Sequence, residues 1–236
     1  SSLKIVGAIM AYSLGMDRQD EEQLDLLLHL MRERRSVRSL RPDPVPTEVL
    51  ERLLEAARWA PSAGNRQAFR LLVVTSRPVL EQMGLAVRRA AERVAAAARQ
   101  DRAESVRSYL DNFCHFAGAP AVVAPIYRAS ADLLGPSAEA GRGQGAVSRA
   151  VVDSLSSVSA AVMNLLLAAH AANLGACWMT GPLIAAGELG RILNVPAGWD
   201  LAALVPIGYT DEAPAAPRRR PPESMARWID EPAEEP

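Results

Sequence analysis

Residues 154–182 read SLSSVSAAVMNLLLAAHAANLGACWMTGP and join a long apolar run to a glycine-containing turn. From Val158 onward, apolar residues recur at three- and four-residue spacing and cover nearly the whole circumference of a helix. A helix that is apolar all round is normally buried. The pattern therefore predicts a central helix that begins near residue 148 and ends at Gly175 as a C′ glycine, followed by a short strand over 176–179.

On either side of this stretch, amphipathic helical patterns alternate with short β-branched runs, and no internal repeat is visible. Helices are expected at 21–33, 48–59, 183–193 and, as one or two surface helices, within 78–116; strands are expected at 69–75, 121–127 and 201–209. Thr47 is expected to be the N-cap of the second helix. The proline-rich segment 213–222 predicts an extended arm without a core of its own.

The length of 236 residues and a hydrophobic content of 49% suit one large domain. We expect this domain at 21–225, with an N-terminal arm at 1–20, a variable glycine-rich loop at 129–145 and a C-terminal tail at 226–236. The apolar stretch 5–14 is about half as long as a bilayer crossing requires, so no membrane association is expected.

The net charge and the cysteines indicate which partners and which cellular compartment to expect for this protein. The formal net charge is −1, which gives no overall field to attract a polyanion, so nucleic acid is not an expected partner. Cys114 and Cys177 are the only cysteines, and they lack CxxC spacing, which favours a reducing, cytoplasmic location. The three histidines are far apart in the sequence and form no ligand pair, so no metal site is expected.

Arginines gather near both ends of the chain. Arg34, Ser36 and Arg38 alternate, so their side chains share one side if this segment is extended, and Arg218 and Arg220 have the same spacing in the arm. Guanidinium clusters of this kind suit a small anion such as a phosphate. The alternative is that these arginines are ordinary surface residues exposed to solvent, and their pattern alone does not exclude it.

Two turns could contact a flat heteroaromatic ring. Ser62 and Asn65 lie in a turn-rich stretch after a helix and offer hydrogen-bonding groups, although an ordinary Asx or serine turn has the same composition. Thr180 and Gly181 follow an expected strand, where glycine permits close backbone approach to a ring. The sequence GRGQG at 141–145 has the wrong spacing for a dinucleotide-binding turn, and no protein nucleophile is evident.

Taken in order, several stretches resemble the nitroreductase family of FMN enzymes. They are RRSVR at 34–38, APSAGNRQ at 60–67, MNLLLAAH at 163–170, CWMTGP at 177–182, IGY at 207–209 and RRRP at 218–221. Each motif is weak alone, but the ordered set spans about residues 26–225 and is specific. The stretches APSAGNRQ and ACWMTGP look closer to the subgroup that includes the C-terminal domain of the coenzyme F420 biosynthesis protein than to the classical members.

The resemblance implies an α+β nitroreductase-like sandwich, in which a mixed, antiparallel-dominated sheet is flanked by helices. It also implies an intertwined homodimer with two FMN sites at the interface. By position, Arg34, Arg218 and Arg220 would bind the phosphate. Ser36 would contact the phosphate or the ribityl chain, and Arg38 the ribityl chain and the N1/O2 edge. Ser62 and Asn65 would come from the partner subunit. The complete set of expected cofactor-binding residues is Arg34, Arg35, Ser36, Arg38, Pro61, Ser62, Asn65, Gln67, Met179, Thr180, Gly181, Arg218 and Arg220.

The implied activity is transfer of hydride from NADH or NADPH through flavin N5 to a small electron-poor acceptor, in ping-pong order and without an obligatory catalytic acid or base. A nitroaromatic, a quinone or an activated alkene would serve as the acceptor. The alternatives are reduction of an unsaturated deazaflavin precursor of coenzyme F420 and a non-catalytic FMN sensor. A synthase that consumes its flavin also resembles this family, but its usual sequence differs around 61–67 and 178–182.

Overall fold

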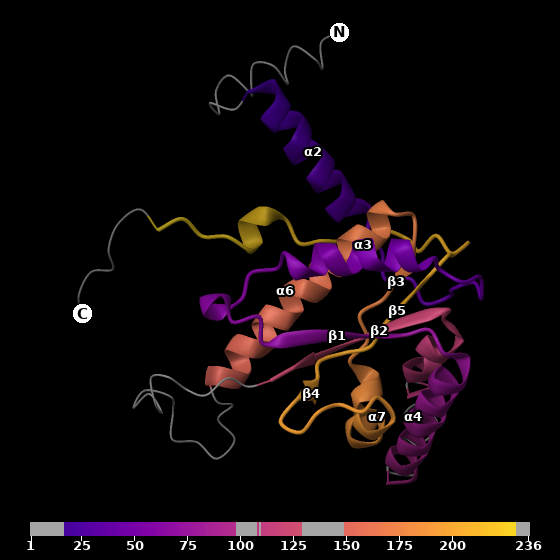
Figure 1. Cartoon of the computed structure of the whole chain (residues 1–236). Helices are drawn as coiled ribbons and strands as arrows, with labels where there is room; N and C mark the ends of the chain where they lie inside the picture. The colour runs from indigo at the N-terminus through magenta and orange to yellow at the C-terminus, as the bar shows by residue number, and fades with distance from the viewer. Residues whose placement is uncertain (1–16, 98–107, 109, 129–148, 230–236) are drawn as a thin grey trace.

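A five-stranded sheet forms the centre of the protein in the computed structural model, which describes residues 17–97, 108, 110–128 and 149–229 (Figure 1). The strands are β1 (Phe69–Val74), β2 (Ala121–Tyr127), β3 (Gly175–Ala176), β4 (Asp200–Leu201) and β5 (Val205–Gly208). Their order is β1-β2-β5-β3, and β4 pairs with the far end of β2. Every pairing between described strands is antiparallel.

Helices cover both faces of this sheet. They are α2 (Arg18–Glu33), α3 (Thr47–Arg58), α4 (Arg77–Ala97), α6 (Arg149–Ala171) and α7 (Ala186–Ile192), with 3₁₀ turns η1 (Ala63–Asn65), η2 (Asn112–Gly118), η3 (Gly181–Ala185) and η4 (Pro222–Ser224). Leu53 of α3 and Leu165 of α6 belong to one core, whereas Met83 of α4 and Leu189 of α7 belong to the other. The predicted α+β sandwich is therefore confirmed (Figure 1).

Helix α6 is the central helix that its apolar pattern predicts. Val158, Val162 and Leu165 are completely buried, and the helix packs against α3 and the sheet. Ala150–Ala171 is long and apolar enough to cross a membrane, a property that buried core helices share. The other side of α6 is exposed and also carries apolar side chains, among them Val152, Leu155 and Met163.

The predicted C-cap of α6 is wrong. The residue in the left-handed conformation is Asn173, at φ 57°, and not Gly175. Gly175 lies instead in β3, where a Cβ would come within 2.8 Å of Val37 and 2.9 Å of Leu40. The glycine is required because neighbouring side chains pack directly on the backbone.

Several other element boundaries differ from the prediction. β3 is Gly175–Ala176 and not 176–179, and the expected helix 183–193 is divided into η3 and the shorter α7. Thr47 is the first residue of α3, Pro46 precedes it, and no side chain caps the helix. The expected strand over 201–209 is divided into β4 and β5, because β2 pairs with the two parts separately. The expected helical region 78–116 contains α4 and then η2, and α4 is not a pure surface helix because it buries one face that includes Leu80.

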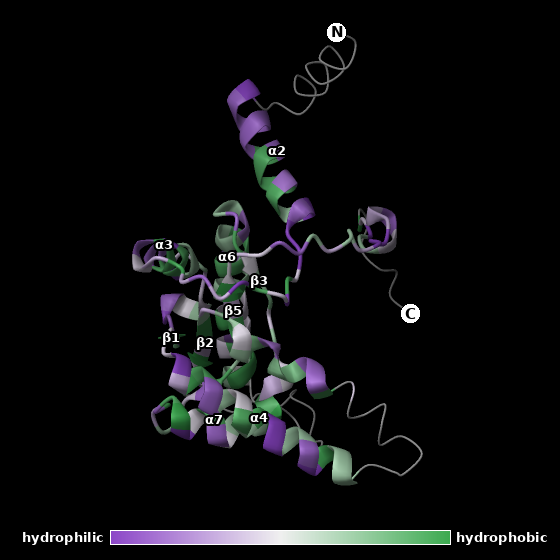
Figure 2. Ribbon diagram, turned by 90° about the vertical axis from the view of Figure 1, so that its right-hand side faces the viewer, coloured by the Kyte–Doolittle hydropathy of each residue, from purple (hydrophilic) through white to green (hydrophobic). Residues whose placement is uncertain are grey.

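Helix α2 and the C-terminal arm extend away from the sheet and its helices (Figure 2). Asp17 caps α2 by accepting hydrogen bonds from the backbone N–H groups of Gln19 and Asp20. The helix buries no residue, and Leu24, Leu27 and Met31 are exposed. The arm is extended as predicted; the expected 129–145 loop and most of the expected N-terminal arm and C-terminal tail lie outside the described residues.

Candidate functional site

The arginine segment 34–41 is extended and lies along the end of the sheet. The Val37 N–H donates to the Ala176 carbonyl at 3.0 Å, and the Arg41 N–H donates to the Tyr209 carbonyl at 2.7 Å. Val37 is buried, whereas Ser36 and Arg38 on either side of it are exposed. The predicted alternation therefore holds for Ser36 and Arg38, whereas Arg34, expected on the same side, lines a different cavity together with Arg35. β3 and the segment after β5 set the position of the Arg38 backbone.

A cavity of about 400 Å³ brings Arg38 together with the residues that follow β3. Its lining consists of Arg38, Asn112, Phe113, Cys177, Trp178, Met179, Thr180, Gly181 and Pro182. We call it the Arg38 cavity. The structure thus places four of the expected cofactor residues around one space, although more than 140 positions of sequence separate Arg38 from Met179.

Two residues of the Arg38 cavity could not be identified individually from the sequence. Asn112 and Phe113 belong to η2, which follows the Ala- and Arg-rich helical region. Phe113 contacts Gly181 so closely that a Cβ at position 181 would overlap its ring. The fit between an aromatic side chain and a glycine backbone is a tertiary contact, and no periodic signal reports it.

The thiol of Cys177 lies beside the same segment. Cys177 is only 3% exposed. Burial raises the pKa of its thiol, and the positive charge of Arg38 only partly opposes this effect. A neutral thiol is a weak nucleophile. The cavity therefore offers positive charge and hydrogen-bond donors, and the Cys177 side chain is not activated for covalent catalysis.

A second cavity, of about 330 Å³, lies beside Arg34 and Arg35. We call it the Arg34 cavity; its other lining residues include His170, Thr210 and Glu212. Burial, followed by the nearby Arg34 guanidinium, lowers the pKa of His170. Among the described residues, the buried Nε atoms of Arg34 and Arg35 have no hydrogen-bond partner.

These unpaired guanidinium nitrogens fit the phosphate of FMN. A buried donor without an acceptor costs about 1–3 kcal/mol, and more when the group is charged. A phosphate supplies several anionic oxygens to such donors. Arg35 also donates to the backbone carbonyls of Arg32 and Arg34, so its guanidinium is held partly by its own chain.

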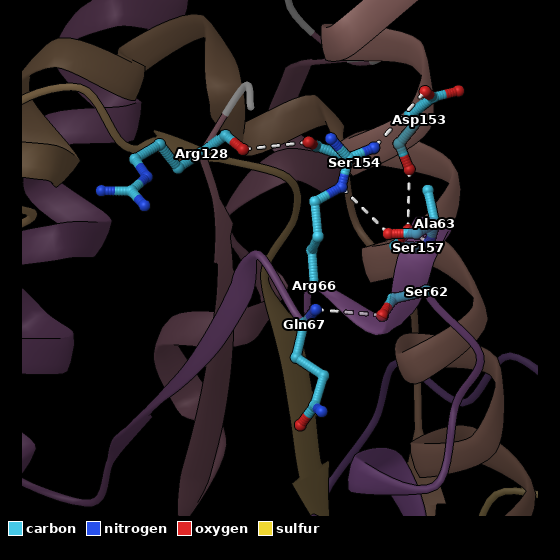
Figure 3. A network of polar contacts seen from close by, with 8 residues as sticks. All are labelled: Ser62, Ala63, Arg66, Gln67, Arg128, Asp153, Ser154 and Ser157. Carbon is cyan, nitrogen blue, oxygen red and sulfur yellow. Dashed lines mark hydrogen bonds and ion pairs between the residues drawn. The ribbon is translucent and has the colours of Figure 1, made fainter. Parts of the chain in front are cut away.

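The turn at 61–67 is held by hydrogen bonds within it and is attached to α6 (Figure 3). The Ser62 hydroxyl accepts a hydrogen bond from the Gln67 N–H at 2.9 Å, and the Gln67 side chain donates to Asn65 Oδ1 at 3.1 Å. Asn65 and Gln67 both have positive φ, at 51° and 47°. Arg66 lies 3.9 Å from Asp153 of α6, which holds the turn on that helix.

Some expected site residues are not brought to these cavities within one chain. Neither cavity is lined by Pro61, Ser62, Asn65 or Gln67. Arg218 and Arg220 are exposed in the arm and line neither cavity. Their assignment to the cofactor stays a prediction that requires a second subunit or a different position of the arm.

Comparison with known proteins identifies the family. The model of the nitroreductase family matches residues 31–209. The chain is 25% identical over 200 residues to "Putative NAD(P)H nitroreductase YfhC" of Bacillus subtilis, covering 84% of this chain and 92% of that protein. It is 32% identical over 198 residues to a "5,6-dimethylbenzimidazole synthase" of Rhodobacter capsulatus, covering 83% and 90%.

Solved structures agree with this result. A BluB-like flavoprotein from Clostridium difficile superimposes with a TM-score of 0.72 at 21% identity, over 86% of this chain and 99% of the other. A putative nitroreductase from Desulfovibrio desulfuricans, crystallised in complex with FMN, gives a TM-score of 0.59 at 26% identity, over 87% and 97%. The family match, the FMN complex of the Desulfovibrio desulfuricans protein and the unpaired Nε atoms of Arg34 and Arg35 lead to one conclusion: the chain belongs to the nitroreductase family and is an FMN-dependent oxidoreductase.

Proposed function

We propose that the protein passes hydride from NADH or NADPH through flavin N5 to a small electron-poor acceptor, with donor and acceptor using the same site in turn. A nitroaromatic, a quinone or an activated alkene has the required chemistry. The observation that carries this proposal is the Arg38 cavity, which Arg38 lines together with the turn at Met179, Thr180 and Gly181. FMN, when bound, supplies the two-electron chemistry, and the chain supplies orientation and charge.

Each part of the site has a distinct task in this proposal. Arg34 and Arg35 would hold the phosphate, because their buried Nε atoms lack partners among the described residues. Arg38 would place positive charge beside the N1/O2 edge, which gains electron density on reduction. Gly181 lets the backbone and the Phe113 ring meet without a side chain between them, so it shapes the wall of the acceptor space.

The complete site would require two subunits. The apolar outer side of α6, helix α2 and the arm residues Met225, Trp228 and Ile229 are exposed in one chain. Exposed apolar groups on several elements favour an interface between copies of the chain. In such a homodimer, Ser62 and Asn65 would reach the cofactor of the other subunit, as the family resemblance implies.

The cytoplasmic location stays a prediction. Its support is that Cys114 and Cys177 are both free thiols in the structure, as expected in a reducing compartment.

The proposed reaction is tested with the purified full-length protein. Its visible spectrum should show bound FMN, and NADH or NADPH oxidation should accelerate when menadione or nitrofurazone is added. Bound FMN without turnover for any donor and acceptor would overturn the proposal and favour a non-catalytic sensor. Turnover confined to an unsaturated deazaflavin would favour the coenzyme F420 branch.

A second candidate function is the synthesis of 5,6-dimethylbenzimidazole from the flavin. The relative of that name, 32% identical over most of both chains, is the observation that favours it. The reduced protein would be exposed to oxygen, and the products would be analysed by mass spectrometry. Loss of flavin with formation of 5,6-dimethylbenzimidazole would replace hydride transfer as the assignment, whereas intact flavin after many turnovers would support the reductase.

A further inference from the structure

The side chains of Thr210 and Glu212 join the arginine segment 34–41 to the segment that follows β5 and leads into the C-terminal arm. One oxygen of Glu212, Oε2, accepts hydrogen bonds from the backbone N–H groups of Arg38 at 3.0 Å and Ser39 at 2.8 Å. The Thr210 hydroxyl donates to the Ser39 carbonyl at 2.8 Å and accepts from the Glu212 N–H at 2.9 Å. These four hydrogen bonds are called the Glu212 latch below.

The latch acts directly on the backbone of Arg38. On one side of Arg38, the Val37 N–H is bound to the Ala176 carbonyl at 3.0 Å. On the other side, Glu212 holds the N–H groups of Arg38 itself and of Ser39. The residue is therefore restrained from both directions, which limits the directions in which its side chain can leave the backbone. That side chain lines the Arg38 cavity.

The latch also determines where the arm begins. Glu212 follows β5 by four residues, and Arg218 and Arg220 come six and eight residues after it. Arg41 and Asp211 add an ion pair at 3.5 Å between the same two segments. A carboxylate that accepts two backbone N–H bonds is well suited to such a junction, because it satisfies donors that a turn would otherwise leave open.

We propose that Glu212 is a positioning residue for the flavin site: its carboxylate holds Arg38 in the direction that meets the flavin. This inference rests on the proposed placement of Arg38 beside the cofactor. It goes beyond that placement because Glu212 itself is not required to touch FMN. The competing explanation is that the latch is only a surface turn that stabilises the chain.

Two substitutions separate these explanations. Both backbone bonds end on the same oxygen, so the amide oxygen of Glu212→Gln can accept both, whereas Glu212→Ala can accept neither. Glu92→Ala, an exposed glutamate on α4, is the matched control. The measured quantity is the dissociation constant of FMN from the full-length apoprotein, read by quenching of flavin fluorescence.

If Glu212 acts by holding Arg38 in place, the variants should give a specific pattern of FMN affinities. Glu212→Ala should weaken FMN binding at least tenfold, Glu212→Gln should stay within about threefold of the wild type, and Glu92→Ala should have no effect. In an Arg38→Ala background, Glu212→Ala should weaken FMN binding by less than about a further twofold. The reduction potential of bound flavin should also fall in Glu212→Ala, in the same direction as in Arg38→Ala.

The other results overturn the inference. If Glu212→Ala binds FMN as the wild type does, or weakens binding equally with and without Arg38, Glu212 does not act through Arg38. If Glu212→Ala does not fold, Thr210→Val carries the test, because it removes the hydroxyl that holds the Ser39 carbonyl and the Glu212 N–H. A wild-type protein that fails to bind FMN would instead refute the proposed function, and the latch inference with it.

Discussion

The ring of Phe113 lies directly against Gly181, so closely that a single methyl group at position 181 would overlap it. Phe113 belongs to η2 and Gly181 opens η3, and both line the Arg38 cavity. The contact links the wall of the cavity to the turn that follows β3. A change in this contact should therefore alter both the stability of the protein and the shape of the Arg38 cavity, where an acceptor would bind.

Substitution of Gly181 by alanine should destabilise the protein by about 1–3 kcal/mol, because the new Cβ forces the Phe113 ring to move. Thermal unfolding measures the loss, and the KM for menadione should change in parallel. Gly187→Ala is the control, since nothing lies within 4 Å of a Cβ at that position. In a Phe113→Ala background, Gly181→Ala should cost little stability, and an equal cost in both backgrounds would show that the overlap is not the cause.

Replacement of Arg34 by alanine should weaken FMN binding by about 10- to 100-fold, the range expected for one charge-assisted hydrogen bond. The stability of the apoprotein should fall little, because Arg34 Nε has no partner among the described residues. Arg77→Ala, which removes an exposed ion pair with Glu81, is the matched control. Equal FMN affinity in the two variants would remove Arg34 from the phosphate site.

Removing the charge of Arg38 should lower the reduction potential of the bound flavin and slow its reduction by NADH or NADPH. A positive group beside the N1/O2 edge favours the reduced, more negative ring. A decrease of about 30 mV corresponds to about 1.4 kcal/mol for a two-electron couple. Spectroelectrochemical titration of Arg38→Ala and Arg38→Lys measures the change, and an unchanged potential in Arg38→Ala would contradict the assignment.

The stability of the apoprotein should decrease as the pH falls through the range of His170. Burial and the charge of Arg34 lower the pKa of His170 in the folded state. The unfolded chain, with an ordinary histidine pKa of about 6.5, therefore takes up its proton first. Stability is then complete above about pH 6.5 and is lost as the pH falls toward the folded-state pKa.

Melting temperatures between pH 7.5 and 5 measure this dependence. It should become shallower in His170→Gln. Bound FMN should also reduce the slope of the wild type, since a phosphate beside His170 opposes the effect of Arg34. An identical slope in wild type and His170→Gln would show that other groups control the pH response.

Charge on the outer side of α6 should prevent dimer formation. Leu155 is 40% exposed on this side, and Leu155→Glu would introduce a carboxylate into the proposed subunit interface. The variant should be a monomer by light scattering and should lose FMN on gel filtration. Val94→Glu on α4, where the native side chain is 46% exposed, should remain a dimer. Two variants with the same mass and the same FMN content would refute an α6-centred interface.

Local sequence patterns were sufficient for most of the fold. The largely apolar pattern of residues 158–169 predicts a central helix, and the β-branched run at 121–127 predicts a strand covered on both faces. Local patterns could not specify where α6 ends, because asparagine and glycine both tolerate the left-handed conformation. Only the packing of side chains on Gly175 showed that Asn173, and not Gly175, has this conformation.

The sequence by itself determined the order of helices and strands, the alternation that exposes Ser36 and Arg38 around buried Val37, and the family through its ordered motifs. The secondary structure and the alternation depend on neighbours within a few residues, which the chemistry of the chain specifies directly, whereas the family is indicated by the order of motifs over about residues 26–225. Only the tertiary structure decided that Phe113 meets Gly181 and that Glu212 holds Arg38. Such contacts join residues up to 174 positions apart, and they arise because the sheet brings the ends of its strands to one place.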